Sequence, residues 1–288
     1  MGFDVTRRRW AVRAGSTAAV AAMGVVANAC GGGGGAQARD RFPSRAETFV
    51  LLHGSWHGGW CWQKVRSRLQ RQGFDVFAPT FTGMSDRARY GSLTTGLAAH
   101  IDEVASMLDA LDLTQVVLVG HSYAGIVISG VAERAAARIK RLVYLDAFAL
   151  RDGESAFTFF PPDVRDLFVA LAQSGNGWGV PPPPTAADDF LGPTGAAGSA
   201  STVDRSFLEA RLTLLPLSTH SETLSMPTGA AQALPRTYIS CLRFPNLNTN
   251  KARVRQESGW EYRELDTYHD CMLTAPDALT ALLLEAAG

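Results

Sequence analysis

Val116-Val117-Leu118-Val119-Gly120-His121-Ser122-Tyr123-Ala124-Gly125 is the stretch that decides the fold. A run of β-branched and aliphatic residues, too short for a helix, ends in Gly-x-Ser-x-Gly, and small residues continue into a helix-compatible segment at 126–139. This is the sequence form of a nucleophile elbow, in which a strand turns sharply into a helix. Gly120 and Gly125 are needed because a Cβ would clash where the two backbones approach. We therefore predict that Ser122 is a nucleophile.

The amide that follows this serine belongs to the first turn of the expected helix. Unpaired N–H groups at a helix N-terminus favour an anion. The N–H of Tyr123 is therefore predicted to be one donor of an oxyanion hole.

The rest of the sequence alternates short apolar runs with segments of helical spacing. The expected strands are residues 48–52, 74–78, 116–119, 142–145, 236–241 and 262–265. The expected helices are residues 60–72, 97–111, 126 to about 138, 251–256 and 276–287. Strands that are buried on both faces read as apolar throughout, so this alternation predicts an α/β fold. We expect a mostly parallel sheet of about six strands with helices on both faces.

Residues from about 150 to 234 break this alternation. Proline runs at 161–162 and 181–184 and a Gly/Ala/Ser-rich stretch at 192–201 exclude regular strand–helix units there. Short helical patterns remain at 164–173 and 206–214. We predict that this segment is a lid inserted over the carboxyl ends of the strands, where substrate choice is usually made.

The first 29 residues have the features of an export signal. Arg7 and Arg8 precede an uncharged Ala/Val-rich run at 14–29, which ends in the small-x-small pattern of a cleavage site. This resembles a bacterial twin-arginine signal peptide. Cys30 follows the expected cleavage position and begins a Gly-rich tether, residues 30–45, which also resembles a lipoprotein anchored to a membrane through that cysteine. A plain secreted protein is the alternative, and in both cases the exported folded domain is residues 46–288.

Composition narrows the class of protein and its partners. An apolar content of 46% and a charged content of 19% are typical of a globular protein with a sizeable core. Without residues 1–29 the chain carries a net charge of about −3 and has no basic stripe, so no nucleic-acid partner is expected. Beyond Cys30, three cysteines remain, an odd number whose spacing fits no zinc site: Cys61, Cys241 and Cys271. We expect buried thiols, with a Cys241–Cys271 bridge as the alternative.

Two further segments complement the elbow. His53-Gly54-Ser55-Trp56-His57-Gly58-Gly59-Trp60 directly follows the first strand, where hydrolases with a nucleophile elbow place their other oxyanion-hole amide. We assign that role to the N–H of Ser55. His269 follows both the nucleophile and the last strand, the place of the general base in this architecture, and an imidazole can take the serine proton and return it. The remaining histidines fit this role less well, although His220 in the insertion is a candidate substrate contact.

From His53 to the C-terminus the chain resembles the α/β-hydrolase superfamily, and within it the branch of plant methylesterases, hydroxynitrile lyases and small bacterial esterases. Three segments carry the resemblance: Phe49-Val50-Leu51-Leu52 continuing through His53 to Trp60, Val119-Gly120-His121-Ser122, and His269-Asp270-Cys271-Met272-Leu273. The resemblance implies an α/β-hydrolase fold with a lid insertion and a Ser–His–acid triad. It does not indicate the substrate.

The acid is where this chain departs from that branch. The branch usually places it just beyond the strand that here ends at Cys241, but residues 242–248 contain no carboxylate. Some hydrolases of this fold carry the acid after the strand that follows the nucleophile, where Asp146 stands. We predict that Asp146 holds the Nδ1–H of His269. Glu264 and Asp266 are the rivals, on a strand whose side chains alternate between faces. The structural alternative is that Asp146 only caps the start of the lid.

Together these features predict a serine hydrolase that cleaves a small carboxylic ester through an acyl-enzyme on Ser122, with no cofactor and no metal. Phe157, Phe159 and Phe160, with few charges nearby, favour an apolar or aromatic ester. A hydroxynitrile-lyase-like activity is one alternative. The resemblance implies a lysine directly after the base in those lyases, and here that position is Asp270, which would repel cyanide. A non-catalytic ligand-binding protein on the same fold is the second alternative.

Overall fold

Six strands lie side by side in the order β2-β1-β3-β4-β7-β8, and every neighbouring pair is parallel. The computed structural model describes residues 47–288; the predicted signal at 1–29, Cys30 and the predicted tether lie outside the described residues. The side chains of β1 and β3 are buried along their whole length, because helices cover both faces of the sheet. The predicted parallel α/β fold is confirmed. The strand bounds are β1 Thr48–Leu52, β2 Asp75–Phe77, β3 Val116–His121, β4 Ile139–Leu145, β7 Arg236–Cys241 and β8 Trp260–Leu265.

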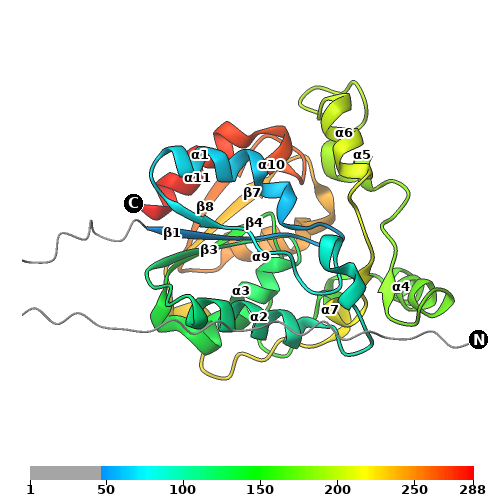
Figure 1. Cartoon of the computed structure of the whole chain (residues 1–288), viewed down its shortest axis with the longest axis horizontal. Coiled ribbons are helices and arrows are strands. Elements are labelled where there is room, and N and C mark those ends of the chain that lie inside the picture. Colours follow the sequence, from blue (N-terminus) through cyan, green and yellow to red (C-terminus); the bar gives the residue numbers. More distant parts are fainter. Residues whose placement is uncertain (1–46) are drawn as a thin grey trace, which may run out of the picture. The chain divides into compact units, whose positions relative to one another are not determined.

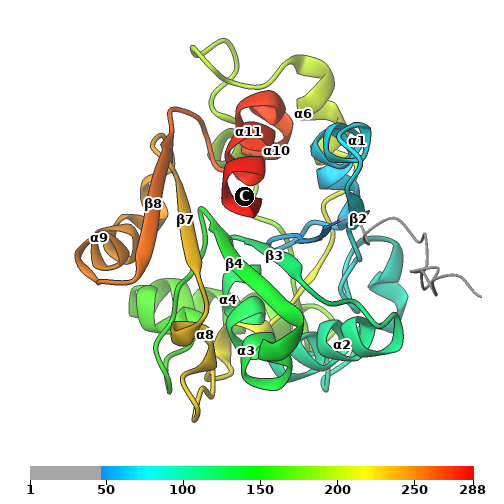
Figure 2. The same ribbon diagram turned by 90° about the vertical axis from the view of Figure 1, so that its left-hand side faces the viewer.

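Two layers of helices enclose this sheet. Helices α1 (Gln63–Arg71) and α11 (Pro276–Ala287) lie on one face, and α2 (Leu97–Ala110) and α3 (Ala124–Ala135) lie on the other (Figures 1 and 2). Helix α9 (Asn248–Gln256) lies beside the edge strand β8 (Figure 2), and the single turn α10 (Cys271–Thr274) precedes α11. Ile101, Val104 and Leu108 lie on one face of α2 and are buried, which is the usual reason that an amphipathic surface helix docks on a sheet, whereas Leu111 just beyond its end is exposed.

Some predicted boundaries are wrong, for identifiable reasons. The helix after the elbow ends at Ala135, a 3₁₀ turn (Ala136–Arg138) follows, and β4 begins at Ile139. The strand was expected to begin at Leu142 because Lys140 and Arg141 are charged. Both are half-buried strand residues with acidic partners, Lys140 with Glu47 and Arg141 with Glu261. A 3₁₀ turn at Gly59–Trp62 replaces the start of the helix predicted at 60–72, and another 3₁₀ turn, Ser85–Tyr90, lies between β2 and α2.

The segment between β4 and β7 adds no strand to the main sheet. Helices α4 to α7 gather beyond the carboxyl ends of the strands (Figure 1). Where a helix was predicted at 206–214, the structure has a helix at Thr202–Glu209. Beyond it the N–H of Thr213 donates to the carbonyl of Trp56, so these residues are not helical. The pair β5–β6 is antiparallel and was not predicted. The bounds are a 3₁₀ turn Ala156–Phe159, α4 Pro162–Ser174, β5 Gly179–Val180, α5 Ala186–Leu191, α6 Thr202–Glu209, β6 Leu215–Pro216, α7 Ser218–Ser221 and α8 Ala230–Ala233.

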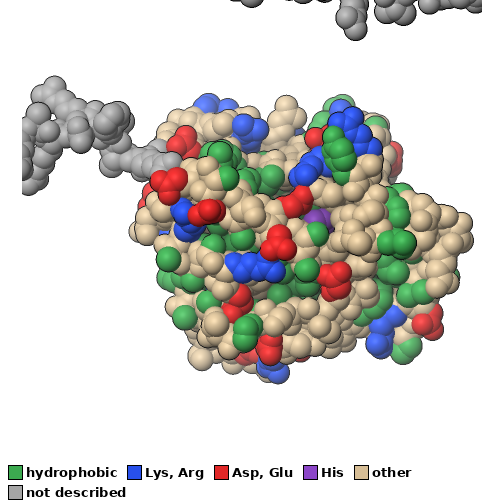
Figure 3. Space-filling view, turned by 60° about the horizontal axis from the view of Figure 1, so that its bottom comes forward, with side chains coloured by type: hydrophobic (Ala, Val, Ile, Leu, Met, Phe, Trp, Pro, Cys, Tyr) green, Lys and Arg blue, Asp and Glu red, His purple; other side chains and the backbone are tan. Residues whose placement is uncertain are grey.

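The surface and the thiols agree with the composition. On the face shown in Figure 3, acidic and basic side chains are interspersed and form no field of one sign. Cys61, Cys241 and Cys271 are buried free thiols, which confirms that expectation, and the alternative Cys241–Cys271 bridge is not formed. Among residues 47–288, no helix is both long enough and apolar enough to cross a membrane.

Candidate active site

The elbow has the strained geometry that its sequence predicts. Ser122 has a φ of 55°, a left-handed conformation that is uncommon for a residue with a side chain, and its N–H donates to the carbonyl of Leu145 at 3.1 Å. A Cβ on Gly120 would lie 2.5 Å from the carbonyl oxygen of Ala124, and one on Gly125 would collide with that of Phe148. Both glycines are therefore required by close approach. The turn leaves Ser122 half-buried, with its side chain on the wall of a cavity.

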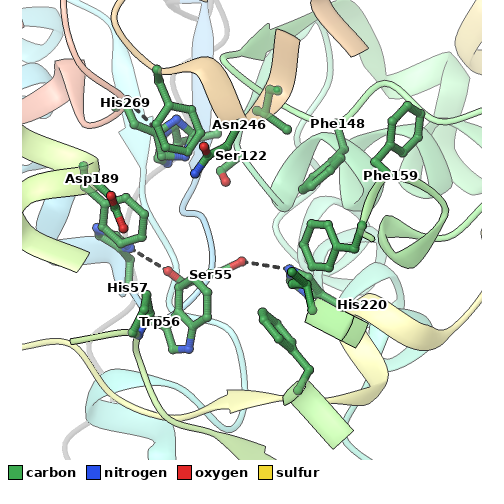
Figure 4. Close-up of a pocket in the computed structure, with 18 of the residues that line it drawn as sticks. Ser55, Trp56, His57, Ser122, Phe148, Phe159, Asp189, His220, Asn246 and His269 are labelled. Atoms are coloured by element: carbon green, nitrogen blue, oxygen red, sulfur yellow. Dashed lines mark hydrogen bonds between the residues drawn. The ribbon is translucent and has the colours of Figure 1, made fainter. Parts of the chain in front are cut away.

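This cavity has a volume of about 400 Å³ and lies between the carboxyl ends of the strands and the lid. Ser122 and His269 lie on one side of it, and Ser55 and His220 face them (Figure 4). Most of the remaining wall is aromatic, and no lysine or arginine lines it. The aromatic residues are Trp56, Phe148, Phe159, Phe160, Phe168, Phe190 and Phe244.

Asp146 and His269 meet as predicted. Nδ1 of His269 lies 2.6 Å from Oδ2 of Asp146, and both side chains are buried. Asp146 stands at the end of β4 with a φ of 42°. Its own N–H donates to the carbonyl of Ile239 at 2.7 Å, which fixes the turn that aims the carboxylate at the histidine. An acceptor on Nδ1 leaves Nε2 of His269 as the nitrogen that can take a proton.

Lys251 is a partner of this carboxylate that the sequence did not reveal. Its Nζ lies 2.8 Å from Oδ1 of Asp146 and donates to the carbonyls of Cys241 and Phe244, each at 2.7 Å. The N–H of Cys241 also donates to Oδ1 at 3.0 Å. Asp146 is therefore paired on both oxygens, as a buried charge requires. A lysine in a short helix gives no sequence signal for this role.

The two rival carboxylates point elsewhere. Glu264 is exposed and pairs with Arg255. Asp266 is also exposed and accepts from Nε and Nη2 of Arg243, both at 2.7 Å. Neither contacts His269. The ring beside His269 is instead Phe244, stacked with its centroid 3.9 Å away, another neighbour that the sequence did not identify.

The two amides assigned to the oxyanion hole are unpaired. Among the described residues, neither the N–H of Ser55 nor that of Tyr123 donates to a protein acceptor. Tyr123 immediately precedes α3, so its amide lies at the helix N-terminus. Buried amides without a partner are rare, and two beside one cavity are suited to an anionic oxygen.

A buried ion pair supports the turn that carries Ser55. Nε2 of His57 lies 2.9 Å from Oδ2 of Asp270, and its Nδ1–H donates to the carbonyl of Ser55 at 2.6 Å (Figure 4 shows the latter). Burial alone would lower the pKa of His57, but the Asp270 carboxylate and these hydrogen bonds outweigh it and raise that pKa above 6.5. The intervening Trp56 has a φ of 63° and is held by its indole N–H, which donates to the carbonyl of Val180 at 3.1 Å. No pattern in the sequence predicts the His57–Asp270 contact.

The other histidines near the elbow are neutral and structural. Burial lowers the pKa of His53 to about 3 and that of His100 to about 4, and it lowers that of His121 well below 6.5. His53 accepts from the N–H of Phe81, and His121 bonds to the carbonyl of His269. Within residues 47–288, no cluster of histidine, cysteine and carboxylate side chains is arranged to hold a metal ion.

Comparison with known proteins places this geometry in context. The profile described as "Alpha/beta hydrolase family" matches residues 49–282. The "Carbendazim hydrolyzing esterase" of Nocardioides sp. (strain SG-4G) is 33% identical over 245 residues, covering 82% of this chain and 97% of the relative. "Methylesterase 17" of Arabidopsis thaliana is 27% identical over 265 residues, covering 85% of this chain and 93% of that protein. Among solved structures, the chain superposes with a TM-score of 0.72 on an extracellular α/β-hydrolase from a Paenibacillus species. That protein is described as sharing structural and functional homology with tobacco salicylic acid binding protein 2. It is 25% identical, covering 83% of this chain and 98% of that one.

Proposed function

Since the chain belongs to the alpha/beta hydrolase family, we propose that it cleaves a small carboxylic ester through an acyl-enzyme on Ser122. It is a carboxylic ester hydrolase, in keeping with its relatives named esterase and methylesterase. The observation that carries the finer proposal is the Asp146–His269 contact on the wall of a cavity that Ser122 also lines.

In the proposed mechanism, the Oγ of Ser122 attacks the ester carbonyl while Nε2 of His269 takes the serine proton. Asp146 accepts from Nδ1–H and stabilises the imidazolium that forms. The N–H groups of Ser55 and Tyr123 bind the tetrahedral oxyanion, where one such donor typically contributes about 3 kcal/mol. The imidazolium then protonates the departing alcohol. Water, deprotonated by His269, attacks the acyl-enzyme and releases the acid and free Ser122.

The cavity favours a small apolar or aromatic substrate. Seven aromatic side chains and about 400 Å³ suit one ring with a short ester group. No lysine or arginine lines the wall to bind a phosphate or a free acid. A relative named for the hydrolysis of carbendazim supports a small ester-like substrate.

The alternatives fit this site less well. A lyase of the related branch would need a cation beside the base, but the next residue, Asp270, is buried and paired with His57, and no lysine or arginine lines the cavity. A purely ligand-binding protein would not need an aligned Asp146–His269 pair beside Ser122, nor two unpaired amides at Ser55 and Tyr123.

The test is labelling with a fluorophosphonate, which phosphonylates activated serines. We expect one adduct, on Ser122, and parallel loss of hydrolysis of 4-nitrophenyl acetate. The matched control is the neighbouring serine variant Ser129→Ala, since Ser129 is buried in α3 away from the cavity and should not affect labelling. Labelling that persists in Ser122→Ala would refute the proposal.

We also infer that the protein is exported, as a lipoprotein or in secreted form. The support is the twin-arginine pattern at Arg7 and Arg8 and the position of Cys30. Arg7→Lys with Arg8→Lys should leave unprocessed protein in the cytoplasm. Cys30→Ser should release the protein from the membrane fraction if it is lipidated. A soluble protein with Cys30 intact would leave only the secreted form.

A further inference from the structure

The mechanism leaves one polar pair on the cavity wall without a role. The hydroxyl of Ser55 lies 3.2 Å from Nε2 of His220, and both face Ser122 and His269 across the cavity (Figure 4). His220 belongs to the lid and is 2% exposed. Its ring stacks on Tyr123, with centroids 5.5 Å apart, and lies 5.8 Å from the ring of Phe168. The pair is thus a polar spot in a largely aromatic part of the wall, while Asp189 and Asn246 line the part nearer His57 and His269 (Figure 4).

The direction of the hydrogen bonds in this pair can be derived. The hydroxyl of Thr219 donates to the carbonyl of Pro216 at 2.6 Å, and a carbonyl can only accept. The single proton of that hydroxyl is therefore used, so its oxygen accepts from Nδ1 of His220, 2.9 Å away. Since Nδ1 carries the proton of the neutral imidazole, Nε2 is bare and accepts the hydroxyl proton of Ser55.

The surroundings of His220 keep its imidazole neutral, as this direction of the hydrogen bonds requires. No carboxylate contacts its ring among the described residues, and burial lowers its pKa to about 3. The proton of Ser55 consequently points at His220 at any working pH. The hydroxyl oxygen then presents only lone pairs to the cavity.

The position of this oxygen defines what it can bind. The proposed oxyanion donor is the N–H of the same residue, so the hydroxyl lies close to the carbonyl of a bound ester. An N–H or O–H group attached beside that carbonyl would come within reach of Ser55 Oγ. In an apolar cavity such a donor would otherwise lose its hydrogen bond to water without replacement.

We propose that Ser55, oriented by His220 and Thr219, selects esters that carry a hydrogen-bond donor beside the scissile carbonyl, such as α-hydroxy esters. This rests on the proposed function, because it places the ester carbonyl at the N–H of Ser55. Ser55 is then a specificity-determining residue through its side chain, apart from the role of its amide.

The experiment compares an ester that carries the donor with one in which a methyl group caps it. We measure kcat/KM for methyl mandelate and for methyl α-methoxyphenylacetate of the same configuration. The wild-type protein should prefer the hydroxy ester by about tenfold, the effect of one hydrogen bond in a desolvated site. A ratio within about twofold of one would overturn the proposal.

Three variants test the hydrogen-bond chain from Thr219 through His220 to Ser55. Ser55→Ala removes the acceptor, and its preference ratio should fall to near one. Thr219→Val removes the acceptor of Nδ1–H, so His220 should adopt the other tautomer, donate to Ser55 and turn its hydroxyl into a donor; the preference should vanish or reverse. Thr219→Ser keeps the hydroxyl and should keep the preference. A preference that survives in Ser55→Ala or in folded Thr219→Val overturns the proposal.

Fluorophosphonate labelling of Ser122 separates the two ways to fail. If the proposed function is wrong, wild-type protein is not labelled on Ser122. If only the selection is wrong, labelling is normal and the two esters react alike. Labelling of Ser122 also reports whether each variant is folded. If Thr219→Val does not fold, the preference ratio of Ser55→Ala alone tests the proposed selection of the hydroxy ester.

Discussion

Oδ2 of Asp146 lies 2.6 Å from Nδ1 of His269, although 123 positions separate the two residues in the sequence. Asp146 follows β4 and His269 follows β8, and both residues lie at the end of the sheet where the parallel strands finish. The carboxylate is anchored from the other side by Lys251 and the N–H of Cys241. As the proposed acid, Asp146 therefore stands at the end of β4, one strand away from the end of β7 where the family resemblance led us to look, and its carboxylate contacts Nδ1 of His269.

Asp146→Asn should lower kcat by roughly 10⁴-fold with little change in KM, because an amide favours the wrong tautomer of His269 and cannot offset its charge. Its thermal stability should also fall, since Lys251 loses its buried partner. Steady-state kinetics and circular dichroism check both effects. Asp266→Asn is the matched control, an exposed carboxylate near His269 in sequence, and should leave kcat within about twofold. An Asp146→Asn enzyme of near-normal kcat would exclude Asp146 as the acid.

Ser122→Ala and His269→Ala should each reduce ester hydrolysis by at least about a thousandfold, with the fold intact. The double variant should lose little more than either single one, because the nucleophile and the base act as a unit. Measurements of kcat/KM for all three proteins check this. Multiplicative losses in the double variant would show that the two residues act independently.

Particular residues show which features of the fold and of the site can be predicted from the sequence. The six strands and the elbow were predicted because buried parallel strands are apolar throughout and the elbow needs Gly120 and Gly125. The start of β4 was missed because Lys140 and Arg141 pair with acids from distant segments. Lys251 and the His57–Asp270 pair were missed for the same reason: their partners are identified only once the chain is folded. The contact of Asp146 could be predicted because the family resemblance implies an acid in some members after the strand that follows the nucleophile, where Asp146 stands.

Gly120→Ala should lower the free energy of unfolding by about 2 kcal/mol or more, since the added methyl group meets the backbone of Ala124 in a turn that cannot move. Gly288→Ala is the control, because this residue is exposed and its Cβ would meet nothing closer than 3.6 Å. That change should stay within about 1 kcal/mol. Urea unfolding measures both, and equal effects would argue against the close approach at the elbow.

The free energy of unfolding should decrease as the pH falls from about 6.5 toward 4. Burial lowers the pKa of His53 to about 3, that of His100 to about 4 and that of His220 to about 3, and it lowers that of His121 well below 6.5. Below pH 6.5 the unfolded chain binds protons at these sites that the folded protein does not, which contributes about 1.4 kcal/mol per pH unit for each histidine. His57 adds no slope in this window, because its raised pKa keeps it protonated in both states; its stabilisation is lost as the pH rises through that pKa.

Urea unfolding at pH 7, 6 and 5 checks this dependence. His220→Gln should remove the contribution of one histidine from the slope. If the free energy of unfolding of the wild-type protein is constant from pH 7 to 5, the imidazoles of these histidines are not buried in neutral form.

The most direct test of the account is to trap the covalent intermediate. The protein is mixed with excess 4-nitrophenyl acetate, quenched in acid within the first turnover, digested and analysed by mass spectrometry. We predict one added acetyl group on the peptide that contains Ser122, formed in step with a burst of nitrophenolate and absent from Ser122→Ala. Hydrolysis without any acetylated peptide, or an acetyl group on another residue at burst rate, would contradict the assignment of Ser122 as the nucleophile.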